Sequence, residues 1–492
     1  MTQHAPPLAR ATSYLDHLHA EYFGAGILKR LAMAGLVLLT LAAAYWLGPR
    51  ASTRYLILLG AAIGGVILLN RPQWGLVLLI PTSLMVPFTV GTGTQTEVPM
   101  TLLLLGALLA VWVVRMTRER DLRLAASPVN LPLLALIVVA GLALVAGQAY
   151  WNPLVSTKST FLFVQLAQWS VFILSAGAFW LTANLVRDIR WLRGIVVLFL
   201  ALGTVYMATR LLPGSWGLTG QLFAPGSTGS LFWVWLTALA AGQALFNRHL
   251  RRPLQLAPVG LIAATFYVAW FQGRDWVSAW APPLVALLVL FWLRSIRLGG
   301  IATIGLIVGV QVGYPYFYEN VFLAAMQTGS FLRVDAWRGI VQLVGERWFL
   351  GLGLAAYWHY WRDMIGTWTY TSGNTVYNPQ VNSHSNYVDI YAQMGVLGLA
   401  VFLWVAVALW RQGWRVRRAV PAGFERGYVY GCLGGLAGSL AAGFLADWFT
   451  PFVYNIGLAG MRASLLGWLF LGGLVAVEQI AHHESQPVSG SA

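Results

Sequence analysis

A histidine and a few arginines are the residues of this sequence whose types best suit chemistry on a substrate. His384 lies in the polar run NPQVNSHSNYVDIY, directly before an apolar stretch. A neutral imidazole there can take a proton from an alcohol near neutral pH, although a hydrogen-bonded surface histidine is the plainer alternative. Arg210 ends an apolar segment, and Arg274 lies in FQGRDW between two others. A guanidinium keeps its charge and binds phosphate oxygens in bidentate geometry, so arginines converging on one cavity predict a phosphate or pyrophosphate site.

Metal-binding and nucleophile motifs are not evident in the sequence. It has no Ser/His/Asp order, Cys/His cluster or DxD-like acidic pair in the polar segments, so neither a metal nor a cofactor is expected. Cys432 is the single cysteine, which excludes an intrachain disulfide. His482 and His483 near the C-terminus are interpreted as part of a solvated tail.

The composition indicates the elements that must position these residues. Of the 492 residues, 58% are hydrophobic and only 10% are charged, whereas soluble domains carry about 25% charged residues. This excludes a soluble multidomain enzyme, a disordered chain and a disulfide scaffold, and it indicates a polytopic membrane protein. The net charge of +15 comes from short basic clusters between apolar segments, as expected for cytoplasmic loops, and this argues against nucleic-acid binding.

Apolar segments of roughly 20 residues, the length that crosses a bilayer, recur along the chain. The candidate spans are 31–48, 54–70, 74–91, 98–115, 130–148, 161–184, 192–211, 228–246, 256–272, 277–294, 299–314, 390–410, 427–446 and 455–476. We therefore expect an all-α fold with about 12–14 transmembrane helices, an uncleaved first helix and both termini cytoplasmic. The expected regions are a tail (1–30), a bundle (31–314), a large periplasmic loop (315–389), further transmembrane helices (390–476) and a second tail (477–492).

The long polar segment 315–389 interrupts this series of spans. Apolar residues within 333–350 recur at helical spacing, which predicts an amphipathic helix at the membrane interface, and aromatic residues here are also typical of an anchoring belt. Arg333 and Arg338 lie in this helix. Arg462 falls inside the last span, where an ion pair with Asp447 is the simplest expectation, and Arg274 has Asp275 as a neighbouring partner.

Two stretches resemble the O-antigen ligase and polymerase superfamily. They are FLRVDAWRGIVQLVGERWFLGLGLAAY and NSHSNYVDIYAQMGVLGLAVFL. They are similar to the family pattern of an Arg before a Trp, a Gly-x-Gly, and then His-x-x-Tyr leading into Gly-x-x-Gly. The matching positions are Arg333, Trp337, Gly351, Gly353, His384, Tyr387, Gly395 and Gly398. Gln393 stands where members usually have an acidic residue. The likeness covers roughly residues 180–475, including QGRDW around Arg274 and LTGQLFAPGSTGSLFWVWLTALA after Arg210.

This resemblance implies a GT-C-like fold and a metal-independent glycosyl transfer at the periplasmic face of the bacterial inner membrane. The implied donor is a glycan on undecaprenyl pyrophosphate, and the implied acceptor is a sugar hydroxyl on lipid A core or on another lipid-linked glycan. It further implies that Arg274 and Arg210 bind the pyrophosphate, with Arg333 and Arg338 as additional ligands, and that His384 orients or deprotonates the acceptor. Tyr387 and Trp337 would shape the pocket. Direct attack by the hydroxyl predicts inversion at the anomeric carbon.

Three other functions remain open at this point. A flippase for lipid-linked glycans would also have many spans and a basic cavity, but it predicts charges within several spans and two comparable halves. A protein O-oligosaccharyltransferase would differ only in its acceptor. A structural assembly subunit would give no reason for the polar surroundings of His384.

Overall fold

The computed structural model describes residues 64–65, 68–93, 97–274, 276–319, 332–364, 370–372, 375–377 and 382–485. The chain divides into two compact units, Met1–Asn70 and Arg71–Ala492. In the first unit the described residues, 64–65 and 68–70, are helical. The expected span 31–48 and most of 54–70 lie outside the described residues.

Helices form nearly all of the regular structure described in the second unit. The long helices are α4 (Pro72–Met85), α5 (Met100–Glu119), α6 (Asn130–Ala149), α7 (Phe161–Leu185), α8 (Ile189–Leu211), α10 (Ser230–Phe246), α11 (Arg252–Gln272), α12 (Val277–Arg294), α13 (Ile296–Val312), α16 (Leu332–Val344), α18 (Asn386–Val416), α19 (Phe424–Leu445) and α20 (Met461–Ser485). Short helices are α9 (Trp216–Leu222), α14 (Tyr314–Phe317), η4 (Gly345–Arg347), α17 (Tyr357–Met364) and η5 (Leu458–Gly460). Two antiparallel hairpins pair β1 (Thr89–Gly91) with β2 (Glu97–Pro99) and β3 (Tyr370–Ser372) with β4 (Thr375–Tyr377).

The helices are those of a multi-pass membrane protein. Within the described part of the chain, nine helices are long and apolar enough to cross a membrane, and α10 and α13 are shorter apolar helices. Each span expected from residue 74 onward overlaps a helix, although the expected span 74–91 also includes β1 and the expected span 455–476 begins in the loop before α20. The expected all-α membrane architecture is therefore confirmed, whereas the assignment of helix ends to one side of the membrane stays a prediction.

Two helices extend beyond the apolar segments that predicted them. α18 begins at Asn386, before the expected start at 390, because its first polar turns are buried against protein. α20 continues past 476 to Ser485. Glu478 in this extension accepts hydrogen bonds from Arg415 (2.8 Å) and Gln412 (2.7 Å) of α18, so polar contacts hold a part of the helix that hydropathy does not mark.

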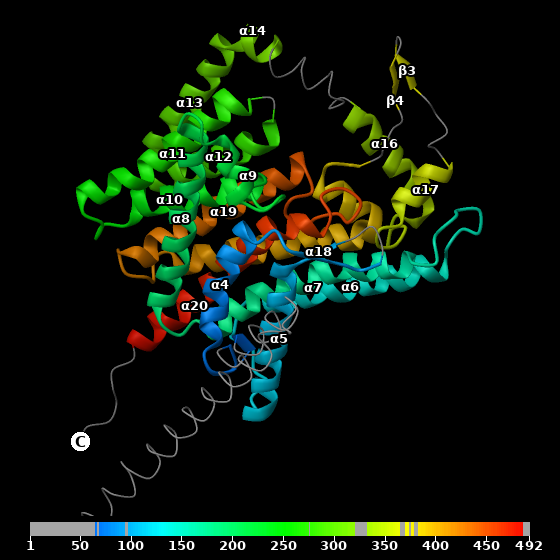
Figure 1. Cartoon of the computed structure of the whole chain (residues 1–492), viewed down its shortest axis with the longest axis horizontal. Helices are drawn as coiled ribbons and strands as arrows, with labels where there is room; N and C mark the ends of the chain where they lie inside the picture. Colours follow the sequence, from blue (N-terminus) through cyan, green and yellow to red (C-terminus); the bar gives the residue numbers. More distant parts are fainter. Residues whose placement is uncertain are drawn as a thin grey trace, which may run out of the picture. The chain divides into compact units, whose positions relative to one another are not determined.

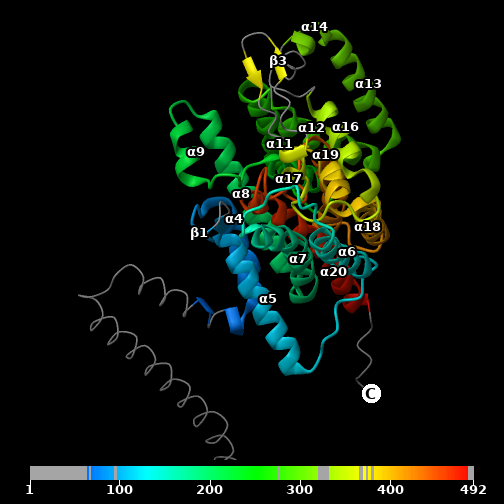
Figure 2. The same cartoon turned by 90° about the vertical axis from the view of Figure 1, so that its right-hand side faces the viewer.

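Glycines allow the central helices to approach closely. A Cβ added at Gly242 of α10 would lie 2.3 Å from the carbonyl oxygen of Gly427 and 2.7 Å from the Cα of Gly431, both on α19. Small residues at such contacts let van der Waals packing stabilise helix pairs in lipid. α10, α12 and α19 pack against one another, α18 packs along α6, and α20 packs along α7 (Figures 1 and 2). This packing fixes the ends of α8, α11, α18 and α19, where the candidate residues lie.

The amphipathic helix expected within 333–350 is present as α16. Ile340 and Val344 on one side are buried, whereas Val334 and Val341 are 43% and 48% exposed. The indole Nε1 of Trp337 donates a 2.6 Å hydrogen bond to the carbonyl of Ser383. α16 is therefore fastened next to the backbone of His384.

The glycines of the family-like pattern lie where two chain segments cross. Gly351 and Gly395 have φ of 73° and 63°, and a Cβ on Gly395 would lie 2.3 Å from the carbonyl carbon of Phe349. Gly395 also breaks α18, and the amides of Val396 and Leu397 donate to the carbonyls of Trp348 (2.8 Å) and Phe349 (3.2 Å). Since only glycine adopts these conformations without strain, the two glycines allow α18 to kink at Gly395 and to form backbone hydrogen bonds with the segment that contains Trp348 and Phe349.

Candidate active site

His384 occupies a tightly held turn at the start of α18. Its φ is 48°, a left-handed conformation that non-glycine residues rarely adopt and that marks a locally determined structure. The hydroxyl of Ser383 accepts from the amide of Ser385 (3.0 Å) and donates to the Asp389 carboxylate (2.6 Å). Tyr357 of α17 donates to the same Asp389 oxygen at 2.5 Å. The half-buried imidazole is thus presented by a turn that α16, α17 and α18 all support.

The loop between α19 and α20, residues 446–457, holds one ring nitrogen of His384. The amide nitrogen of Asn455 lies 3.1 Å from His384 Nδ1 and also donates to the Asp447 carboxylate. Asn382 donates to the Asn455 side-chain oxygen at 3.2 Å. These contacts form a chain from Asp447 through Asn455 to His384.

Asp447 fixes the orientation of the Asn455 amide. A carboxylate accepts hydrogen bonds only, so ionised Asp447 must face the NH₂ group of Asn455, and that group then donates to His384 Nδ1. Asp447 is buried, and burial raises the pKa of its carboxyl, against the lowering effect of hydrogen bonds from Phe452 and Asn455. In its neutral form the His384 imidazole therefore carries its proton on Nε2, which acts as a donor.

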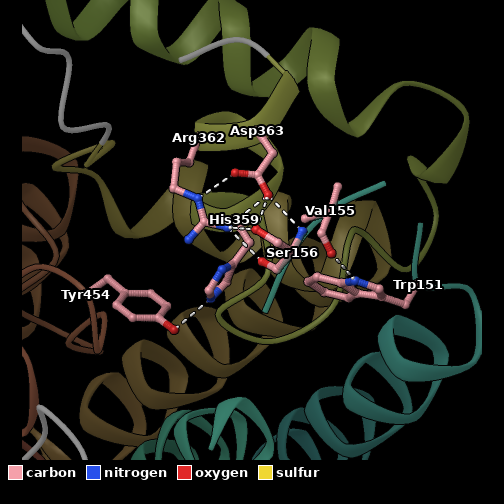
Figure 3. Close-up of polar contacts among 7 residues, drawn as sticks. All are labelled: Trp151, Val155, Ser156, His359, Arg362, Asp363 and Tyr454. Atoms are coloured by element: carbon pink, nitrogen blue, oxygen red, sulfur yellow. Dashed lines mark hydrogen bonds and ion pairs between the residues drawn. The ribbon is translucent and has the colours of Figure 1, made fainter. Parts of the chain in front are cut away.

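The loop 446–457 also contacts His359, a histidine of α17. Tyr454, the neighbour of Asn455, lies with its hydroxyl 2.9 Å from His359 Nε2 (Figure 3). His359 is only 6% exposed, and the ring of Phe161 meets it edge-on at 4.5 Å. Burial, with a smaller effect from the nearby Arg362 cation, lowers the pKa of His359 to about 4, so it is a neutral, packed histidine above that pH.

Arg362 is committed to a surface ion pair. Its Nε lies 2.5 Å from an oxygen of Asp363, and its Nη2 donates to the carbonyl and hydroxyl of Ser156. The Asp363 carboxylate also accepts from the Ser156 amide at 2.7 Å (Figure 3). The guanidinium and these donors hold the pKa of the Asp363 carboxyl well below its usual range. These contacts tie α17 to the loop after α6.

One glutamine joins Arg210 to the end of the helix that precedes Arg274. Arg210 Nε donates to Gln272 Oε1 at 2.8 Å, and Gln272 Nε2 donates back to the Arg210 carbonyl at 2.8 Å. Gln272 ends α11, two residues before Arg274. Arg274 itself is exposed, and its Nη1 donates to the Tyr316 hydroxyl at 2.6 Å. Two guanidinium groups predicted to bind pyrophosphate thus lie at adjoining helix ends, each with an uncharged partner.

Apolar grooves lie beside both parts of the candidate site. One, of about 510 Å³, is lined by Trp270, Tyr316 and a glycine-containing face of α13, next to Arg274. Another, of about 640 Å³, is lined by Trp337, Ser385, Tyr387, Val388, Leu440, Ala441, Phe444 and Leu445, next to His384. Trp337 and Tyr387, the two expected pocket residues, therefore border a single groove, which is open and almost entirely apolar.

The remaining predicted ligands are less well placed by the structure. Arg338 is an exposed residue of α16 that follows Trp337. Arg333 lies on the same helix, but its side chain is outside the described residues, as is Asp275, the expected partner of Arg274. Among the described residues, no hydrogen bond or ion pair joins Arg210 or Arg274 to His384.

A shared loop nevertheless relates the two groups. The segment that follows Arg210 packs on the α19–α20 loop, because a Cβ at Gly229 would lie 2.1 Å from the Trp448 ring. A Cβ at Gly226 would likewise lie 3.2 Å from the carbonyl oxygen of Ala459. The segment between α8 and α10 and the His384 turn thus both contact residues 446–459.

The expected ion pair between Arg462 and Asp447 is wrong. Arg462 is 1% exposed, and its guanidinium donates to the backbone carbonyls of Val86 and Phe88, whereas Asp447 accepts from Asn455 and Phe452. Arg462 begins α20 and reaches the segment after α4, so its partner comes from the opposite end of the sequence. Proximity along the chain was a poor guide to its partner.

Asn455, Asp447 and Gln272 are the site residues that the sequence reasoning missed. The sequence marks Asp447 only as a possible ion-pair partner, and asparagine and glutamine carry no charge that topology singles out. Burial of Asp447 directly after an apolar span was the available signal. Asp389 is also buried in the first turn of α18, and Gln393 accepts from the Ala355 amide at 3.0 Å while donating to the Asp389 carbonyl at 3.1 Å. Gln393 thus has a positioning role, and its donated bond is one that a carboxylate could not make.

Within the described residues, no three His, Cys, Asp or Glu side chains gather closely enough to hold a metal ion. Independence from metal stays a prediction for the reaction. No family model matches the chain, and comparison with curated proteins finds no match.

Proposed function

We propose that this protein is a membrane glycosyltransferase that moves a glycan from undecaprenyl pyrophosphate to a sugar hydroxyl at the outer face of the bacterial inner membrane. The proposal rests on the resemblance around Arg333 and His384. The observation that supports it best is the hydrogen bonding of Arg210 with Gln272, two residues before Arg274, together with the loop 446–459, which contacts both the segment between α8 and α10 and His384. An O-antigen ligase and a polysaccharide polymerase both fit this description.

The arginines supply the electrophilic half of the reaction. The departing pyrophosphate gains negative charge as the anomeric bond breaks, and fixed guanidinium groups stabilise that charge without a proton transfer. Arg210 is oriented by Gln272 and stacks over Trp216 at 5.8 Å, so its guanidinium is positioned before substrate arrives. The apolar groove beside Trp270 and Tyr316 fits the polyprenyl tail.

His384 supplies the acceptor half of the reaction. With Nδ1 accepting from Asn455, its Nε2–H donates to the acceptor oxygen and orients a lone pair toward the anomeric carbon. The acceptor oxygen forms a bond to that carbon as the bond to phosphate oxygen breaks. The hydroxyl proton leaves with the diphosphate, so atoms and charge balance in a single displacement that inverts the anomeric centre. Deprotonation by His384 is the competing role, and it requires the other tautomer.

In vitro transfer with purified protein, a lipid-linked oligosaccharide and several acceptors tests the proposal. Arg274→Gln and His384→Ala should each lower turnover by about 10² to 10⁴-fold while the thermal unfolding profile is retained. Arg362→Gln is the matched control for loss of an arginine, since that side chain is held by Asp363 and Ser156. Normal turnover in the first two variants would refute the mechanism.

The acceptor identifies the subclass. Transfer to lipid A core indicates a ligase, transfer to a second lipid-linked glycan a polymerase, and transfer to a protein hydroxyl a protein O-oligosaccharyltransferase. Movement of intact donor across proteoliposomes without bond cleavage would instead identify a flippase and overturn the proposal.

A further inference from the structure

A groove of about 750 Å³ lies between α8, α10, α11 and α19. It adjoins the beginning of α8 and α19, and it is lined by residues such as Arg193 and Phe424. Arg210 ends α8, and Asp447 follows α19, so the candidate active site lies at the opposite ends of the same helices. The groove is therefore a separate feature, and what it binds does not depend on the proposed reaction.

The long walls of the groove are apolar and open to the side. Val197 and Leu200 of α8 face Leu254 and Leu261 of α11 across it. Val197 is 58% exposed and Leu254 55% exposed, on two helices that are long and apolar enough to cross a membrane. Such surfaces contact acyl chains in a bilayer, so the groove is lined for a hydrocarbon chain.

One end of the groove is polar, and hydrogen bonds position its side chains. Gln243 and Asn247 are 7% and 9% exposed, and Asn247 donates to Gln243 at 2.8 Å. Arg193 lies 5.3 Å over the ring of Phe424, and its Nη2 is 3.8 Å from a Glu425 oxygen, a loose ion pair. The groove thus changes from apolar to polar along its length, as an amphiphile does.

The polar end carries a clear excess of positive charge. The three segments that meet there, 187–193, 247–252 and 421–426, contain seven arginines and two carboxylates. Arg248, Arg251 and Arg252 are exposed in the short connection between α10 and α11. Basic clusters next to membrane helices attract anionic headgroups. Charge complementarity therefore selects a negatively charged amphiphile over a zwitterionic one.

We propose that this groove is a binding site for one acidic glycerophospholipid of the surrounding bilayer. An acyl chain lies between α8 and α11, and the phosphodiester lies at the polar end against Arg193 and the α10–α11 connection. Glu425 competes with the headgroup for Arg193. The lipid would join the first half of the bundle, through α8, to the last, through α19.

Native mass spectrometry of the purified full-length protein tests this site, with phosphatidylglycerol and phosphatidylcholine of identical acyl chains as probes. The wild type should bind phosphatidylglycerol preferentially. Arg193→Gln should reduce that preference roughly fivefold, whereas Glu425→Gln should increase it. Ala201→Trp, which fills the groove, should weaken both lipids.

Matched controls lie on α13, away from the groove. Arg297→Gln removes an exposed arginine, and Ile301→Trp adds an indole at a position that is 69% exposed. Both should bind lipid as the wild type does. Equal binding of the two lipids by the wild type, equal effects of the control and groove variants, or displacement of the lipid by inorganic phosphate alone would overturn the proposal. Protein density in the groove, from another part of this chain or a second copy, would do the same.

Discussion

Replacing Asn455 with leucine tests whether the α19–α20 loop sets the proton position on His384. The variant keeps a similar side-chain size but removes the donor to His384 Nδ1 and the donor to Asp447. A hydrogen bond between neutral groups contributes about 1 kcal/mol, so loss of the bond to the imidazole should lower turnover roughly fivefold to tenfold. Loss of the bond to the Asp447 carboxylate should destabilise the protein by about 2 kcal/mol.

The pH dependence separates orientation from general damage. Burial raises the pKa of the Asp447 carboxyl, so acidification protonates it and it no longer fixes the Asn455 amide. Wild-type turnover should therefore fall on an acid limb as Asp447 becomes protonated, and the Asn455→Leu variant should lack that limb. Asn382→Leu is the control, because it removes only a donor to the far side of Asn455. Wild-type turnover together with an unchanged acid limb in Asn455→Leu would refute the reasoning.

Three further variants test the surrounding structure. His359 has a folded pKa of about 4, below its unfolded value near 6.5, so the folded state binds fewer protons between those values and stability falls as the pH drops through this window. His359→Gln should abolish this loss, which amounts to about 2 kcal/mol between pH 7 and pH 4.5 in thermal unfolding. An unchanged acid sensitivity would contradict it. Gly395→Ala should destabilise the protein by at least about 2 kcal/mol, because Gly395 has a φ of 63° and an added Cβ would contact backbone. Gly106 of α5 faces open space, so Gly106→Ala is the control and should be neutral or mildly stabilising in the same thermal unfolding experiment. Gln272→Leu removes the acceptor that orients the guanidinium of Arg210. It should therefore raise KM for the lipid-linked donor about tenfold and leave the acceptor KM unchanged. Equal changes in both constants would argue against binding of the donor by Arg210.

The sequence predicted the spans well because hydrocarbon imposes a strong and local rule. A helix such as α12 must satisfy its own backbone and be apolar over its whole length, so its bounds, 277–294, could be predicted from composition alone. The end of α20 could not be predicted in this way, since its last turns depend on the contact of Glu478 with α18.

The candidate site could be predicted only in part. The predicted topology singles out Arg210 and Arg274 because cations are uncommon in outer loops, but it does not identify Gln272, which bonds to Arg210 two residues before Arg274. Asn455 is separated from His384 by two long helices in the sequence, and no local pattern marks its contact. Arg462 illustrates the same limit, because its carbonyl partners at Val86 and Phe88 follow α4.

The break at Gly395 divides α18 into two segments with different surroundings. Residues 396–416 alone measure roughly 31 Å at 1.5 Å per residue, close to the thickness of a bilayer's hydrocarbon core. The turns before the break are held by protein, through Asn386 to Thr450 (2.7 Å) and Asp389 to Tyr357. The two segments of α18 thus have different surroundings, and the amides of Val396 and Leu397 fix their junction to Trp348 and Phe349. Turnover should therefore change little across vesicles of different acyl-chain length, since hydrocarbon would meet residues 396–416 whereas protein contacts hold the turns next to His384.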